Sequence, residues 1–239
     1  MNTAETKPVW TITHKFTLAI ILAIQFVVAY VVGTQGLLVN TQQSMIPPIA
    51  ITVIIPVVLF LAAYAMSKSF RKFVLAQDIQ TLTMLQHWRV LGFGFLLLYA
   101  HGVLPGLFAW PAGLGDVAIG FAAPLIIIRL QNNLNYETSS ALVRYHYLGL
   151  LDFAVAVITV GITAGSYAFF TPDGLTSAAM DVWPLNLFPS FGVPIFIILH
   201  LSVLLKVREF VGSNKSSQPA WHQMPDISNP KPKVQRNGK

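Results

Sequence analysis

Long apolar runs alternate with short polar segments along most of the chain. A helix needs about 20 mostly apolar residues to cross the hydrocarbon layer of a membrane. Six runs approach this length, at residues 16–32, 46–66, 90–110, 114–130, 147–170 and 185–207. The pattern predicts an all-α bundle of six transmembrane helices over residues 16–211. A short N-terminal segment, 1–15, precedes it, and a polar tail predicted to be disordered, 212–239, follows.

The third and fourth runs are separated by an unusual segment. Residues 104–116 contain two prolines and three glycines but almost no polar side chains. Non-helical backbone at membrane depth is tolerated only inside protein or beside water. The segment is therefore either a tight hairpin at the membrane surface or a partly re-entrant turn, and we expect the hairpin.

Positive charge falls in every second segment between the runs. The 15 Lys and Arg residues are Lys7, Lys15, Lys68, Arg71, Lys72, Arg89, Arg129, Arg144, Lys206, Arg208, Lys215, Lys231, Lys233, Arg236 and Lys239. The intervening segments, 33–46, 105–115 and 171–185, contain no Lys or Arg. Because cytoplasmic loops of membrane proteins are enriched in these residues, the asymmetry predicts six crossings with both termini in the cytoplasm.

Composition agrees with a membrane protein. Hydrophobic residues make up 54% of the chain and charged residues only 10%, whereas soluble domains have about 25% charged residues. The net charge of +6 is explained by the positive cytoplasmic loops. It predicts contact with anionic lipid head groups rather than with nucleic acid.

Sequence motifs for catalysis are missing. The chain has no cysteine, which excludes disulfides, thiol catalysis and iron–sulfur clusters. The glycine pairs at 92–94 and 113–115 lack the Lys-Ser/Thr of a phosphate-binding loop. The segments between the runs are too short to fold an ATPase or kinase domain. We therefore do not expect an enzyme.

Ionisable residues inside apolar runs indicate function by default, because they are costly in lipid. Arg89, Asp152 and His200 all fall near the cytoplasmic ends of their runs. They could form an ion or proton relay, or a ligand pocket open to the cytoplasm. Alternatively, they provide polar contacts between helices, worth about 0.6 kcal/mol each. His87, Arg144 and His146 are predicted to lie at the membrane interface.

A second polar pair is predicted near the outer surface. A hairpin between the third and fourth runs would bring His101 and Asp116 to a similar depth. A His–carboxylate pair can handle protons near neutral pH. The simpler interpretations are that Asp116 caps the start of the fourth helix and that His101 packs between helices.

Two further interpretations stay open. His200 with His87 or His146 could ligate a single b-type haem, although we expect no cofactor and find no metal-ligand spacing. The chain could instead be a non-catalytic subunit of a homo-oligomer or a partner of another membrane protein. Gly102 with Gly106, and Gly161 with Gly165, have the four-residue spacing that permits close helix contacts in lipid.

Several short motifs carry a resemblance. They are Trp88-Arg89-Val-Leu-Gly92, Leu104-Pro105, Phe108-Ala109, Pro111-Ala-Gly113, Gly115-Asp116, Gly120, Phe188-Pro189, Val193-Pro194 and Leu199-His200-Leu201. This set resembles small bacterial multi-span proteins to which no activity is assigned. The resemblance implies a protein of the bacterial inner membrane and favours Arg89, Asp116 and His200 as site residues. Together these observations predict transport or sensing of a small solute or proton, with Arg89 and Asp116 at opposite faces of the membrane.

Overall fold

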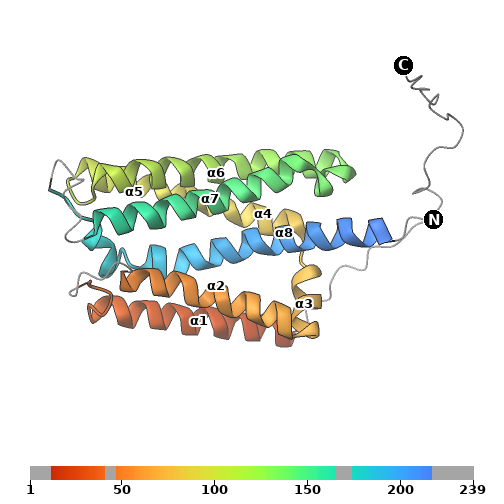
Figure 1. The fold of residues 1–239 in the computed structure, drawn as a ribbon, viewed down its shortest axis with the longest axis horizontal. Coiled ribbons are helices and arrows are strands. Elements are labelled where there is room, and N and C mark those ends of the chain that lie inside the picture. The colour runs from red at the N-terminus through yellow and green to blue at the C-terminus, as the bar shows by residue number, and fades with distance from the viewer. Residues whose placement is uncertain (1–11, 41–46, 165–173, 217–239) are drawn as a thin grey trace, which may run out of the picture.

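The protein folds as an elongated bundle of helices that run side by side (Figure 1). The structure is a computed structural model that describes residues 12–40, 47–164 and 174–216. Every regular element within these ranges is a helix, so the all-α prediction is confirmed. Five helices are long and apolar enough to cross a membrane: Lys15–Thr34, Pro48–Met66, Gly106–Asn132, Ser140–Thr163 and Phe188–Gly212.

The long helices are α1 (Ile12–Thr34), α2 (Pro48–Met66), α6 (Gly106–Asn132), α7 (Ser140–Thr163) and α8 (Val193–Ser216). The shorter ones are α3 (Lys68–Leu75), α4 (Ile79–Met84), η1 (Leu85–Gly92), α5 (Phe93–Ala100), η2 (Leu134–Thr138), η4 (Ser177–Asp181) and η5 (Phe188–Gly192). Helix α8 extends into the predicted tail, whose remaining residues, 217–239, lie outside the described ranges together with 1–11.

The two ends of the bundle differ in charge. One end, on the right in Figure 1, is formed by the last turns of α2, α6 and α8, the first turns of α4 and α7, and α3. Lys68, Arg71, Lys72, Arg129, Arg144, Lys206 and Arg208 belong to these segments. We call this the basic end and the opposite one the neutral end. The neutral end includes the turn between α5 and α6, which contains no Lys or Arg.

The third predicted span is wrong in its boundaries. In place of a helix over 90–110, residues 79–100 form a continuous helical segment, with the 3₁₀ helix η1 between α4 and α5. A hydropathy pattern does not detect the start of this helical segment, because α4 contains polar residues. Asp78 caps its start, accepting a hydrogen bond from the Thr81 backbone N–H at 2.8 Å. The helical segment thus begins about ten residues earlier than the apolar run suggests.

Residues 104–116 form neither a long loop nor a re-entrant turn. The connection is a tight hairpin at residues 101–105, and α6 begins at Gly106 directly after Pro105. Gly102 has a φ of +68°, and the Val103 N–H bonds to the Leu98 carbonyl at 2.8 Å. This is a Schellman ending, which favours glycine at the left-handed position. The expected hairpin is therefore present, but α6 is longer than predicted.

Two prolines free backbone carbonyls that side chains then satisfy. Pro124 removes the usual helical donor to the Gly120 carbonyl, and His87 Nδ1 lies 2.9 Å from that oxygen. Pro194 does the same at Ser190, whose carbonyl accepts a hydrogen bond from Gln25 Nε2 at 3.4 Å. Side-chain donors of this kind are what allow proline in a membrane helix. Gln25 thereby ties α1 to the start of α8.

Several large polar side chains are buried in the mainly apolar interior of the bundle, and many apolar side chains lie on its outside. The largest fully buried side chains include Arg89, His146, His200, Gln86 and Asn186. The outward faces of α1 and α2 are rich in exposed Ile, Leu and Val. A water-soluble protein rarely exposes an apolar surface of this extent. The distribution fits a chain that lipid surrounds and whose interior carries the chemistry.

Candidate functional site at the centre of the bundle

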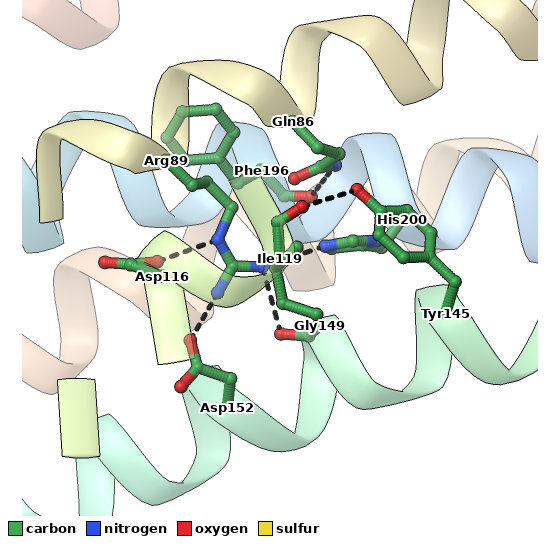
Figure 2. A network of polar contacts seen from close by, with 9 residues as sticks. All are labelled: Gln86, Arg89, Asp116, Ile119, Tyr145, Gly149, Asp152, Phe196 and His200. Atoms are coloured by element: carbon green, nitrogen blue, oxygen red, sulfur yellow. Dashed lines mark hydrogen bonds and ion pairs between the residues drawn. The ribbon is translucent and has the colours of Figure 1, made fainter. Parts of the chain in front are cut away.

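Arg89 is the centre of a buried ionic cluster (Figure 2). It is the eleventh residue of the 79–100 helical segment, and its side chain has no exposed surface. Its Nε donates to Asp116 Oδ1 on α6 at 2.7 Å, and its Nη2 donates to Asp152 Oδ2 on α7. A single guanidinium therefore holds two carboxylates from two other helices.

The guanidinium of Arg89 has further partners. Nη1 donates to the Gly149 carbonyl at 3.3 Å and lies 3.0 Å from His200 Nε2. The Phe153 ring covers the guanidinium, with its centroid 4.0 Å from Cζ. Four of the five N–H groups of arginine thus have partners, and one face stacks on an aromatic ring. These four hydrogen bonds and the ring contact explain how a charged group is held in an apolar bundle.

Glycines make room for each of the partners. A Cβ at Gly92 would collide with the Asp116 side chain, and one at Gly115 with the Asp152 carboxylate. A Cβ at Gly149 would collide with the His200 imidazole and lie 3.0 Å from Arg89 Nη1. The glycines of η1, α6 and α7 therefore permit the close approach of helices that the cluster needs.

The histidines continue the cluster toward the basic end with a fixed hydrogen-bond direction. A guanidinium only donates, so His200 Nε2 accepts from Arg89, and the proton of neutral His200 sits on Nδ1. His200 Nδ1 lies 2.8 Å from His146 Nδ1, which must therefore accept. His146 Nε2 lies 3.5 Å from Thr83 Oγ1, and Thr83 in turn donates to the Ile79 carbonyl at 2.7 Å. Both histidines are thus neutral.

The formal charges of the cluster do not cancel. Arg89 contributes +1 and the two aspartates contribute −1 each, which leaves a net charge of −1 when both are ionised. Their exposure is also unequal, because Arg89 is fully enclosed whereas the Asp116 and Asp152 side chains are 15% and 12% exposed. Within the described part of the chain, Asp116 Oδ2 and Asp152 Oδ1 accept no hydrogen bond. Both aspartates line an open space.

That space is a cavity of about 620 Å³, a volume that includes its opening. Its walls come from the first turns of α2, the N-terminal half of α6, the C-terminal half of α7, and η4 and η5. Most of the other lining residues lie toward the neutral end. Among them are Phe95, Phe108 and Phe188. Asp116 and Asp152 therefore form the inner limit of a cavity that lies in the neutral half of the bundle.

The structure brings together four of the five predicted site residues. Arg89, Asp152 and His200 do form one buried cluster, as the sequence suggested. The predicted separation of Arg89 from Asp116 is wrong, because they form a direct ion pair. Asp116 lies ten residues after the start of α6, about 15 Å along its axis, and is not a cap at the outer surface.

His101 does not join Asp116. It lies at the end of α5 and is exposed, so the predicted outer pair is not formed. The sequence also misplaced His146, which is fully buried against His200 rather than at the interface. A signal was available, because His146, Gly149 and Phe153 have the three- and four-residue spacing of one helix face. Thr83 and Gln86, both fully buried, were missed entirely.

The histidine geometry does not fit the haem alternative. Two axial imidazoles would need their nitrogens about 4 Å apart, twice a metal–imidazole bond of about 2.0 Å, with the macrocycle between them. The facing nitrogens of His146 and His200 are 2.8 Å apart and hydrogen-bonded. His87 bonds to the Gly120 carbonyl instead. The described residues also contain no group of three or more His, Asp or Glu able to hold a metal ion.

A protein-family model covers most of the chain. A family model described as a domain of unknown function, DUF8737, matches residues 46–208. The matched range starts just before α2 and includes Arg89, Asp116, His146, Asp152 and His200. No curated protein and no solved structure matches the chain.

Proposed function

The chain belongs to the DUF8737 family, and we propose that this protein carries or senses a small solute through its helix bundle. The observation that supports this function best is the pair of carboxylates, Asp116 and Asp152, that share one arginine at mid-depth and face a cavity. Intramembrane charges of this kind typically mark a substrate or ion pathway. The solute would enter from the neutral end and contact the carboxylate oxygens that have no donor.

A purely structural role explains less of the geometry. Charged groups that only join helices normally pair with one another, whereas in this cluster two carboxylates share one cation and both aspartates line a cavity. An uncompensated negative charge in an apolar bundle is costly. A site that is completed by a ligand accounts for that cost.

A continuous proton wire is also less well supported. Arginine stays protonated in proteins, so Arg89 cannot relay a proton between the carboxylates and His200. The hydrogen bonds from His200 to His146 and on to Thr83 therefore run in one direction only. We propose that these histidines position Arg89 and that the solute binds at the aspartates.

We further propose that the chain crosses a bacterial inner membrane six times, with both termini in the cytoplasm. The 79–100 segment would add a sixth crossing to the five long helices and would be the third along the chain. Its 14 α-helical and 8 3₁₀ residues span about 37 Å, which is enough to cross a hydrocarbon layer about 30 Å thick. The basic end would face the cytoplasm. There Lys68 and Lys72 of α3 would meet anionic lipid head groups.

Single-cysteine labelling tests this topology directly, because the natural chain contains no cysteine. We expect His101→Cys, in the α5–α6 turn, to react with a membrane-impermeant maleimide in intact cells. Asn132→Cys, at the end of α6, should react only after the membrane is opened. Equal labelling of both positions from the same side would contradict a crossing between them.

The solute site is tested by charge neutralisation. Reconstituted protein is exposed on a solid-supported membrane to amines, amino acids, sugars and carboxylates in turn, and charge movement is recorded. We expect currents with at least one class of solute and a loss of at least tenfold in Asp152→Asn. Glu137→Gln removes the same charge from η2, outside the cluster, and should leave the currents unchanged. Undiminished currents in Asp152→Asn would exclude the proposed site.

A further inference from the structure

We infer that the cavity selects an organic cation, specifically a protonated amine attached to an apolar body. This inference rests on the proposed function and adds the chemical class of the solute. Its starting point is the net charge of −1 that the cluster has when both Asp116 and Asp152, which share the single guanidinium of Arg89, are ionised. A ligand carrying one positive charge would bring this sum to zero.

The side chains of the cavity wall supply acceptors but no donors. Its lining side chains come from Pro47, Ile49, Ala50, Val53, Phe95, Phe108, Ala112, Asp116, Asp152, Phe153, Ala156, Val157, Val160, Met180, Phe188, Pro189 and Val193. Ionised carboxylates only accept hydrogen bonds, and the other side chains have no N–H or O–H group. An anion would find no side-chain cation of its own here, because four of the five N–H groups of Arg89 are directed to Asp116, Asp152, Gly149 and His200.

Sugars and zwitterions fit no better than anions. Their hydroxyl or carboxylate groups would be buried against apolar side chains, and an unpaired buried polar group costs about 1–3 kcal/mol. An alkyl- or arylamine avoids this cost, because its only polar group is the ammonium. The ammonium N–H groups can reach Asp116 Oδ2 and Asp152 Oδ1, which lack donors within the described residues.

The aromatic residues add to this preference. Phe95, Phe108, Phe153 and Phe188 all contribute to the wall, and Phe95 packs with its ring centroid 5.4 Å from Phe108 and 5.0 Å from Phe188. Aromatic faces attract cations and also accept apolar chains. The wall thus suits both parts of the same ligand, with the ammonium at the carboxylates and the apolar body toward the neutral end.

Three probes of one chain length separate charge from apolar contact. Hexylamine is a cation near neutral pH, 1-hexanol is neutral and hexanoate is an anion. Binding of each to the purified full-length protein is measured by isothermal titration calorimetry in the same detergent. We expect hexylamine to bind at least tenfold more tightly than 1-hexanol and hexanoate not to bind. This comparison needs no variant, so it does not depend on the folding of one.

Variants then locate the site. Asp116→Asn and Asp152→Asn each bring the cluster to a net charge of zero, and each should weaken hexylamine binding at least tenfold. Glu137→Gln should not. The cation preference would be overturned if hexylamine and 1-hexanol bound with equal affinity. If binding of both probes were also lost in Asp152→Asn, the proposed solute site would still hold. Absence of saturable hexylamine binding, or unchanged binding in both aspartate variants, would also overturn the inference.

Discussion

Replacing Arg89 with methionine is expected to lower the free energy of unfolding by about 3–5 kcal/mol, the usual cost of breaking a buried ion pair by removing one partner. Methionine keeps the apolar stem of the side chain but has no counterpart of the guanidinium, so the variant loses the cation of the cluster. Asp116 and Asp152 would be left without the cation that each contacts. The measurement is equilibrium unfolding in mixed detergent, followed by circular dichroism.

Arg129→Met provides the matched control for this prediction. Arg129 lies in the last turn of α6 and is exposed, and surface changes usually stay within about 0.5 kcal/mol. We expect this variant to unfold like the natural protein. Equal stability of the Arg89 and Arg129 variants would mean that the buried cluster is absent or that its charges are already neutral.

The second large effect is expected from a single added methyl group. Alanine at Gly149 would place its Cβ against the His200 imidazole and 3.0 Å from Arg89 Nη1. His200 is fully buried, and its ring contacts Tyr145, His146 and Phe153, so it has little room to move. Overpacking of this kind costs about 1–3 kcal/mol. We expect a lower melting temperature and weaker solute binding, because the arginine would be displaced as well.

Gly161→Ala makes the same change on the same helix in open space. No atom outside the neighbouring backbone lies within 4 Å of a Cβ at that position, and alanine is the better helix former. We expect this variant to be at least as stable as the natural chain. If thermal unfolding of the two glycine variants were the same, the close packing of α7 against α8 would be wrong.

The apolar pattern was sufficient to predict an all-α fold and to locate most of its long helices. It failed between residues 79 and 116 because a hydropathy pattern ends a span where polar residues begin. The α4–η1 segment mixes Gln80, Thr81, Thr83 and Gln86 with apolar residues, so its first half did not count as membrane helix. The pattern consequently predicts that Arg89 marks the cytoplasmic boundary, whereas Arg89 lies in the middle of the 79–100 helical segment.

The site was predictable only in part, for a related reason. The sequence predicts one layer for Asp152 and His200 because both fall at a similar distance from the cytoplasmic ends of their apolar runs. Asp116 was assigned to the opposite surface because the start of α6 is rich in proline and glycine, which usually indicate a loop. Those residues instead allow helix packing, as at Gly113, where a Cβ would lie 3.2 Å from the Gly92 carbonyl. Close approach of this kind is a property of the packed helices and leaves no periodic signal.

The most direct test is a charge cycle at the three ionised side chains. Unfolding free energies are measured for the natural protein, for Arg89→Met, for Asp116→Asn with Asp152→Asn, and for the variant that combines all three changes. If one arginine holds both carboxylates, the combined variant should be more stable than Arg89→Met alone, because no buried charge is then left unpaired. Losses that simply add across the cycle would show that these side chains do not interact, and would contradict the account.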